Sequence, residues 1–258
     1  MKGCDNLVEK KATRKEEIEK SREEHMHTTE ETPISIPPAP DADSNKSPKE
    51  DFPIVGIGAS AGGLAVFEAF FSAFPTNTDT GMAFVLVQHL DPNHKSILTD
   101  LIGRYTQMPV YEVKNGMFVQ PDCVYVIPPK SDMIFQDGIL QLLEPAEPRG
   151  HRLPIDLFFK SLAQSMQEMA IGIVLSGTGS DGTLGVRAIK AEGGMVMVQS
   201  PESSEYDGMP RSAIATGLVD YILKPAEMPA QLIAFASQVF VPQNLHNLPC
   251  LPLGVRER

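Results

Sequence analysis

The sequence predicts an α/β fold, a doubly wound and mostly parallel sheet with helices on both faces and a small antiparallel hairpin. From Phe52 onward, short apolar runs alternate with segments of helical periodicity. Most of these runs are continuously apolar, as in strands that are buried on both faces of a parallel sheet. One later run carries Asp137-Gly138 at its centre, which is typical of the tight turn between two antiparallel strands.

Composition divides the chain into three parts. Residues 1–52 are rich first in charged residues and then in Pro, Ser and Asp. They have too few large apolar side chains to offset the entropy lost on ordering the chain. We therefore expect a disordered tail over 1–52, one folded domain over 53–240 and a C-terminal tail over 241–258.

Strands and helices alternate along the folded part. We expect strands where apolar runs are bounded by Gly, Pro or polar residues, and helices where apolar residues recur three and four positions apart. In chain order, the expected elements are the strand 53–58, the helix 63–74, the strand 82–89, the helix 94–105, the strands 110–114 and 123–129, the hairpin 133–143, the helix 155–169, the strand 170–177, the helix 182–194, the strand 195–199, the helix 210–217, the strand 219–223 and the helix 225–240.

Net charge and cysteine usage exclude several classes of function. The formal charge of -11 argues against a nucleic-acid partner and against anionic membranes, because both need clustered Lys and Arg. The three cysteines are far apart and match no metal or redox spacing, so we expect neither a metal nor a cofactor. The chain starts without an apolar signal segment and has no run near the roughly 18 apolar residues of a membrane span. We expect a cytoplasmic protein with no integral membrane segment.

The stretch PIVGIGASAGGLAVFEAF at the start of the folded part has two interpretations. Gly56, Gly58 and Ala61 fit the G-x-G-x-x-A pattern of a dinucleotide-binding turn. Gly58, Ser60 and Gly62 fit the G-x-S-x-G pattern of a turn that presents a nucleophile. Both patterns need a strand, a tight turn and a helix, so this stretch alone does not choose between them.

Three of the expected strands end in residues that can do chemistry together. Ser60 follows the first strand, His89 ends the second, and Asp181 lies in the glycine-rich loop after the strand that begins at residue 170. The carboxyl ends of parallel strands lie at one edge of a sheet, where ligands bind. Serine, histidine and aspartate form the triad that acyl transfer needs. A dinucleotide site would instead need an acidic residue where Gln88 and His89 stand, so the serine interpretation is favoured.

Five segments together resemble the catalytic domain of the chemotaxis methylesterase CheB. They are VGIGASAGG, VLVQHL, GHRLPIDLFFKSLA, GIVLSGTGSDGTLGVRAI and YDGMPRSAIATG, in this order from about residue 53 to 238. The resemblance implies a doubly wound parallel domain that hydrolyses glutamyl methyl esters on the cytoplasmic helices of chemoreceptors, with glutamine deamidation as a second activity. It carries the family's nucleophile, histidine and aspartate onto Ser60, His89 and Asp181. It also carries a histidine of the family's cleft onto His151.

The sequence departs from the usual family pattern in two places. CheB proteins usually have an N-terminal receiver domain, whereas only the charged tail precedes Pro53 here, so control by phosphorylation is not implied. Receiver-less domains of this kind also begin fusions with the opposing methyltransferase, which makes a methyltransferase an expected partner, fused or separate. Thr178 stands where the family often has methionine, which bears on the substrate pocket.

The backbone N–H groups of Ala61 and of the loop around Thr178 are the expected donors to the oxyanion, because Ala61 directly follows the nucleophile at the start of a helix. Ser60 and Asp181 also have possible structural roles. Ser60 could be a turn residue or a helix cap, and Asp181 could be a turn residue or the N-cap of the following helix. A non-catalytic chemosensory scaffold and a nucleotide-binding domain remain as alternative functions.

Overall fold

The computed structural model describes residues 52–76, 79–88, 98–145 and 152–239. Its main element is a seven-stranded sheet in the order β10-β9-β8-β1-β2-β5-β3, in which every neighbouring pair is parallel. The strands are β1 (Ile54–Ala59), β2 (Ala83–Gln88), β3 (Val110–Glu112), β5 (Val124–Val126), β8 (Ala170–Val174), β9 (Met195–Gln199) and β10 (Tyr221–Leu223). The predicted α/β fold class is confirmed.

The strand order reverses direction between β1 and β8. From β1 the chain proceeds through β2 toward β3 and β5 at one edge, and from β8 it proceeds through β9 to β10 at the other. In open parallel sheets, ligands bind at such a switch point, outside the carboxyl ends of the two strands. The residues that follow β1 and β8 are therefore the ones to examine for function.

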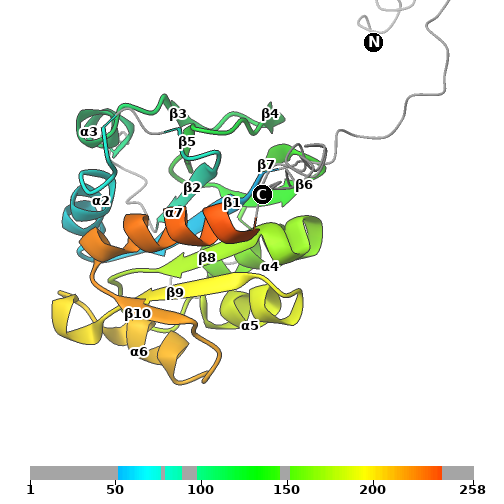
Figure 1. Cartoon of the computed structure of the whole chain (residues 1–258). Helices are drawn as coiled ribbons and strands as arrows, with labels where there is room; N and C mark the ends of the chain where they lie inside the picture. The colour runs from blue at the N-terminus through cyan, green and yellow to red at the C-terminus, as the bar shows by residue number, and fades with distance from the viewer. Residues whose placement is uncertain (1–51, 77–78, 89–97, 146–151, 240–258) are drawn as a thin grey trace, which may run out of the picture. The chain divides into compact units, whose positions relative to one another are not determined.

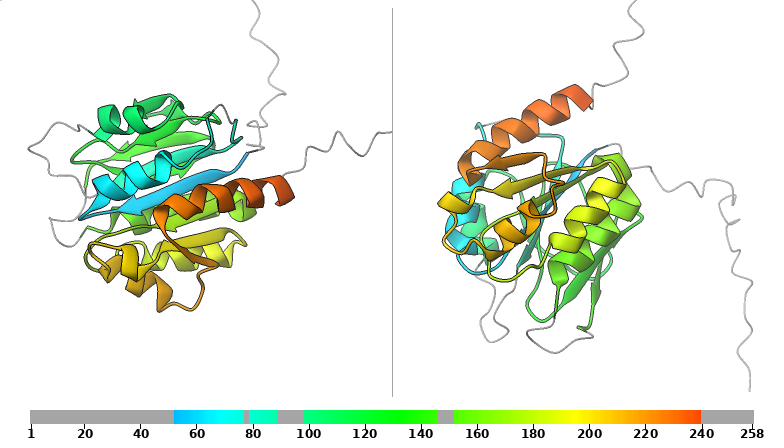
Figure 2. Two further views of the ribbon diagram at one scale, coloured as in Figure 1. Left: turned by 60° about the vertical axis from the view of Figure 1, so that its left-hand side comes forward. Right: turned by 90° about the horizontal axis from the view of Figure 1, so that it is seen from below.

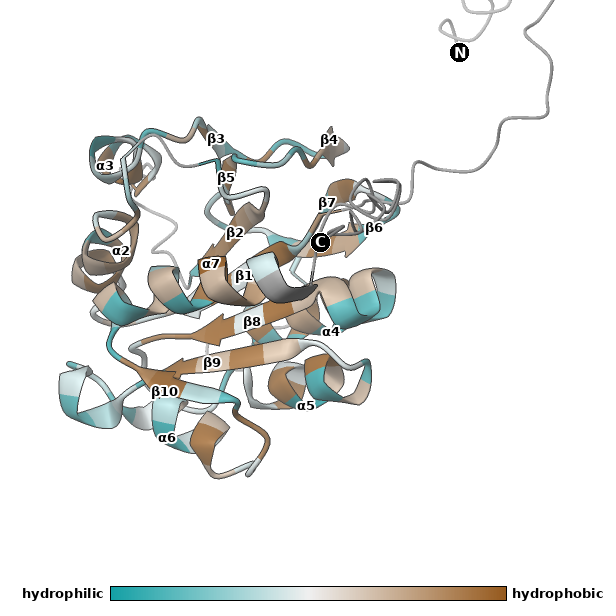
Figure 3. Ribbon diagram, in the orientation of Figure 1, coloured by the Kyte–Doolittle hydropathy of each residue, from teal (hydrophilic) through white to brown (hydrophobic). Residues whose placement is uncertain are grey.

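Helices cover both faces of this sheet (Figures 1 and 2). One face packs against α4 (Pro154–Met166), α5 (Thr183–Ala191) and α6 (Gly208–Ile214). The other packs against α2 (Gly63–Phe71), α3 (Leu98–Tyr105) and α7 (Met228–Val239). Apolar residues fill the interior strands β8 and β9, whereas the helices show hydrophobic and hydrophilic bands (Figure 3).

Two glycines of β1 are explained by the close approach of α4. A Cβ added at Gly56 would lie 3.0 Å from ring atoms of Phe158 and Phe159, and one added at Gly58 would lie 2.4 Å from Cγ2 of Ile155. Real Cβ atoms do not come as close as one at Gly58 would, and one at Gly56 would be unusually close, so glycine at both positions lets α4 pack tightly against this part of the sheet. These two glycines therefore have a packing role that requires no phosphate group.

The predicted hairpin is confirmed and is part of a larger unit. β6 (Asp132–Gln136) and β7 (Ile139–Leu143) pair antiparallel, and the two turn residues, Asp137 and Gly138, both have positive φ. A third strand, β4 (Met117–Phe118), pairs with β7 and makes a three-stranded sheet. This strand was not predicted, because two residues are too short to show an alternating pattern.

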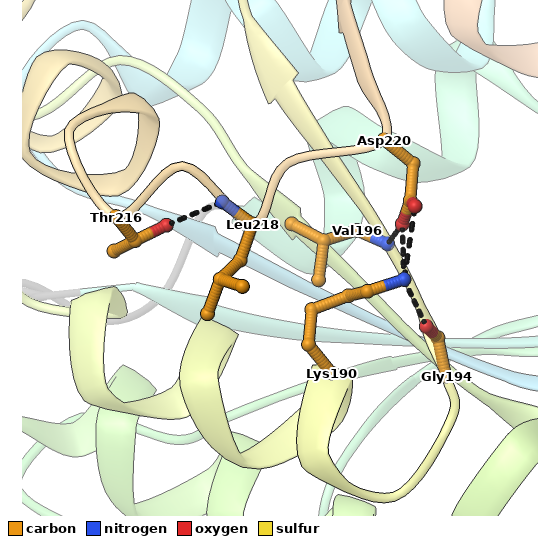
Figure 4. Close-up of polar contacts among 6 residues, drawn as sticks. All are labelled: Lys190, Gly194, Val196, Thr216, Leu218 and Asp220. Atoms are coloured by element: carbon orange, nitrogen blue, oxygen red, sulfur yellow. Dashed lines mark hydrogen bonds and ion pairs between the residues drawn. The ribbon is translucent and has the colours of Figure 1, made fainter.

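A polar cluster fixes the opposite end of the sheet, where β9 begins (Figure 4). The Lys190 ammonium donates to the Gly194 carbonyl at 3.0 Å and to both Asp220 oxygens at 2.9 Å. Asp220 also accepts from the Val196 N–H at 2.8 Å. The cluster holds α5, the start of β9 and the segment before β10 together, at the end of the sheet opposite to the carboxyl ends of the strands.

No helix among the described residues is long and apolar enough to cross a membrane.

Candidate active site

Ser60 lies in a tight turn between β1 and α2. Its N–H donates to the Ser176 carbonyl at 3.0 Å, and its own carbonyl accepts from the Gly63 N–H at 3.1 Å and from Nε2 of Gln88 at 3.3 Å. The N-cap of α2 is Gly62, with φ of 76°, and no side chain caps this helix. Gly62, and not Ser60, is therefore the helix cap, and Ser60 lies half-buried at the switch point.

A buried hydroxyl that the sequence analysis missed supports this turn. The Ser176 side chain is fully buried, and its hydroxyl lies 3.0 Å from the Ala61 carbonyl and 3.3 Å from the Tyr206 carbonyl as a donor. It also accepts from the Tyr206 N–H at 3.1 Å. The Ser176 N–H in turn donates to Oε1 of Gln199 at 2.8 Å. The turn of Ser60, the loop after β8 and the loop after β9 are thus joined through buried polar groups.

Asp181 is buried, with 3% of its surface exposed, and it accepts three backbone N–H groups. Oδ2 accepts from Ile155 at 3.0 Å, and Oδ1 accepts from Asp156 and Gly182, each at 2.9 Å. Two of these donors belong to the first turn of α4, whereas the N-cap of α5 is Gly182 with no side-chain cap. Asp181 is a turn residue, as one interpretation had it, but the expectation that it caps the following helix is wrong. Its carboxylate caps the preceding helix instead.

The two loops that carry Ser60 and Asp181 lie against the same residue of α4. Gly58, two residues before the nucleophile candidate, faces Ile155, and a Cβ added at Gly182 would lie 3.2 Å from Cγ2 of the same Ile155. A Cβ added at Gly177 would lie 2.9 Å from that of Ser60. Ser60 and the loop 176–182 are therefore neighbours at the carboxyl edge.

A loop after β9 closes one side of this site. The Gly177 N–H donates to the Tyr206 carbonyl, and the Met209 N–H donates to the Gly177 carbonyl, both at 2.9 Å. A Cβ at Gly177 would come within 2.2 Å of the Met209 sulfur. The absence of a side chain at Gly177 therefore lets Met209 approach the nucleophile turn closely.

The remaining predicted site residues fall into two groups. Ala61 and Thr178 lie in the described turn and loop, where Thr178 is exposed and Ala61 half-buried. His89 and His151 lie outside the described residues. The catalytic role of every one of these residues stays a prediction. The described ranges hold no group of three or more His, Cys, Asp or Glu side chains suited to a metal ion.

A second buried carboxyl lies beside Asp181. Asp156 is 2% exposed, and its Oδ1 accepts from the Gly185 N–H at 2.7 Å. Burial raises the pKa of Asp156 above its usual range, and the neighbouring charge of Asp181 raises it further, against the lowering effect of the Gly185 hydrogen bond. The sequence analysis did not single out Asp156, which stands in the expected helix as an ordinary acidic residue of the first turn.

The family model of the CheB methylesterase matches residues 55–232. The chain belongs to the CheB methylesterase family. A crystal structure of the Thermotoga maritima CheB methylesterase catalytic domain is similar to it, with a TM-score of 0.63, 28% sequence identity, and coverage of 71% of this chain and 98% of that one.

Curated relatives agree with this assignment. The protein-glutamate methylesterase/protein-glutamine glutaminase 2 of Burkholderia lata is 33% identical over 79% of this chain and 58% of its own length. The corresponding enzyme of Mesorhizobium japonicum is 34% identical over 70% of this chain and 53% of its own length. An uncharacterized 104.1 kDa protein of Rhodobacter capsulatus is 46% identical over 49% of this chain, a match that spans 13% of that protein. The chain thus spans little more than half the length of the two named enzymes.

Proposed function

We propose that this chain is a serine hydrolase that removes methyl esters from glutamate side chains of chemoreceptors, with glutamine deamidation as a second activity. The observation that carries the proposal is the placement of Ser60 and Asp181. They follow the neighbouring parallel strands β1 and β8 at the switch point of a CheB-family sheet. The names of the relatives in Burkholderia lata and Mesorhizobium japonicum give the same two activities.

The proposed mechanism gives His89 the role of general base. His89 comes directly after Gln88, which pairs with Ala59 at the ends of β2 and β1. Alternate residues of β2, such as Val85 and Val87, belong to the face covered by α4, as do the even positions of β1. His89 would take the hydroxyl proton of Ser60 as the oxygen attacks the ester carbonyl, and Asp181 would orient the imidazole.

The tetrahedral intermediate needs hydrogen-bond donors that are already in place. The backbone N–H of Ala61 follows the nucleophile just before the start of α2, and the loop 176–182, which carries Thr178, is a neighbour of Ser60. One such donor is worth roughly 10²–10³ in rate. Methanol leaves, water attacks the acyl-enzyme, and the glutamate side chain is restored. His151 is proposed to contact the substrate helix.

The proposed substrate sets the expected partners. A methylated receptor helix is a protein substrate, so we propose a cytoplasmic site of action and a methyltransferase as the opposing enzyme, fused or separate. The Rhodobacter capsulatus relative supports only that a domain of this kind occurs within a longer chain. The dinucleotide alternative loses support, because the glycines of β1 are explained by the packing of α4.

The test is methanol release from a methylated chemoreceptor by the full chain, its Ser60→Ala variant and the control Ser237→Ala, which changes an exposed serine of α7. We expect release by the wild type and the control only, with unchanged circular dichroism for all three. A fluorophosphonate probe should label the wild type and not Ser60→Ala. Equal release or labelling after Ser60→Ala would refute the serine mechanism. A wild type that neither releases methanol nor takes the label would favour the scaffold alternative.

A further inference from the structure

Two carboxyl groups form reciprocal hydrogen bonds between the first turns of α4 and α5. Asp181, in the loop that leads into α5, accepts from the N–H groups of Ile155 and Asp156 in α4. Asp156, in α4, accepts from the N–H of Gly185 in the first turn of α5 at 2.7 Å. Each helix thus presents its unpaired N-terminal N–H groups to a carboxyl that the other segment supplies.

These reciprocal hydrogen bonds help to set the orientation of the Asp181 carboxylate. A carboxylate held by three N–H groups keeps one orientation only while the donors stay in place. Two of the three donors belong to α4, and Asp181 itself belongs to the chain that enters α5. A shift of α5 along α4 would therefore pull Asp181 away from its donors. The hydrogen bond from the Gly185 N–H to Asp156 opposes this shift, together with the packing of Gly185 against Phe159.

The burial of the Asp156 carboxyl has an energetic cost. Its Oδ2 is buried and has no hydrogen-bond partner, and Asp181 is a second acidic group close to it. The opposing favourable influences are the N–H groups of Leu184 and Gly185 and the charge of Lys160. An apolar residue of similar size in the same place would avoid the cost of the unpaired oxygen. The carboxyl gives what such a residue lacks, an acceptor for the first turn of α5.

We propose that Asp156 is a positioning residue of the hydrolase, which acts through Asp181 by holding the first turn of α5 against the first turn of α4. The proposal rests on the proposed function, since it concerns the residue that orients the general base. A misplacement of about 1 Å in a catalytic group can lower the rate about 10²-fold. A loosened Asp181 should therefore affect the chemical step more than substrate binding.

The test compares the variants Asp156→Ala and Asp156→Asn, each alone and combined with Asp181→Asn. The measured quantities are kcat and KM for methyl-ester hydrolysis on the full chain, well below the unfolding midpoint of every variant. Asparagine keeps an acceptor oxygen for the Gly185 N–H, whereas alanine does not. Lys190→Met is the stability control, because it breaks the cluster at the opposite end of the sheet.

We expect Asp156→Ala to lower kcat at least tenfold while KM changes less than about threefold. Asp156→Asn should stay within about threefold of the wild type. In the Asp181→Asn background, Asp156→Ala should have almost no further effect, because residues that act through one another are not additive. Lys190→Met should lower the unfolding temperature and leave kcat unchanged.

Three outcomes would overturn the role of Asp156: a kcat for Asp156→Ala no lower than that of Lys190→Met, an equal loss in the Asp181→Asn background, or a loss in Asp156→Asn as large as in Asp156→Ala. If Asp156→Ala does not fold, Asp156→Ser replaces it, since the serine hydroxyl is too short to serve the Gly185 N–H. An Asp181→Asn variant with wild-type kcat would show that Asp181 does not orient the base, whereas a wild type that hydrolyses no methyl ester would refute the proposed function itself.

Discussion

Asp181→Asn tests the double role of this carboxylate most directly, because the structure allows the stability cost to be worked out. Asparagine has one acceptor oxygen where the carboxylate has two. With that oxygen toward Asp156 and Gly182, the side-chain NH₂ group faces the N–H of Ile155, and that bond is lost. A buried N–H left without a partner costs about 1–3 kcal/mol. Loss of the negative charge at the start of α4 adds about 0.3–1 kcal/mol.

We therefore expect Asp181→Asn to lower the free energy of unfolding by about 1–4 kcal/mol. In a domain of this size, 1 kcal/mol corresponds to roughly 2–4 °C in unfolding temperature, so the midpoint should fall by about 3–16 °C. Urea unfolding at neutral pH gives the free energy, and calorimetry gives the midpoint. Asp137→Asn is the matched control, since this exposed turn residue has positive φ and precedes Gly138, where asparagine is equally suitable.

The stability change and the activity change separate the two roles. A midpoint for Asp181→Asn within about 1 °C of the wild type would refute the cap on α4. A large loss of stability with unchanged ester hydrolysis, measured well below the midpoint, would show that Asp181 is a cap and not a member of a triad. We expect losses in both.

Three further predictions concern buried polar groups. Ser176→Ala should cost about 1–3 kcal/mol in urea unfolding, because it removes a fully buried hydroxyl that both donates and accepts; an unchanged midpoint would contradict this. Burial raises the pKa of Asp156, so the native state holds this proton more tightly than the unfolded chain. Stability should then fall as pH rises from about 4 to the raised native pKa, and Asp156→Asn should remove that slope; parallel pH curves of the two proteins would refute it. Burial raises the pKa of Tyr125 to about 12, so absorbance at 295 nm should show a late-titrating phenol that Tyr125→Phe or urea removes, with stability falling above pH 10.

The layered fold could be predicted because its signals are local. Continuous apolar runs separated by helical periods require strands that are buried on both faces, and Asp137-Gly138 specifies the hairpin through its two positive φ angles. The edge to which Ser60 and Asp181 belong follows from the same reasoning, since residues after parallel strands gather at one edge. The third strand β4 lacks such a signal, because its two residues pair only once β7 is in place.

The supporting groups of the site depend on contacts between distant segments. Asp181 looked like a cap for the helix that follows it, since capping usually involves neighbours in sequence. The packing of α4 on β1 brings the N–H groups of Ile155 and Asp156 within hydrogen-bond distance of its carboxylate. One signal for Gln199 was present, because it is a polar residue at the end of an otherwise apolar strand, as Gln88 is. Applied to every strand of the sheet, the strand-end reasoning would have found it.

No comparable signal marks Asp156 or Ser176. An acidic residue in the first turn of a helix is ordinary, because it favours the helix dipole wherever it points. Only the approach of α5 turns Asp156 into an acceptor for another helix, and only the return of the chain at Tyr206 gives the Ser176 hydroxyl its partners. The candidate catalytic residues are thus predicted from their places on separate strands. The residues that hold them in position are defined by how the layers of the fold meet, and mutations at Asp156 and Ser176 test this second group.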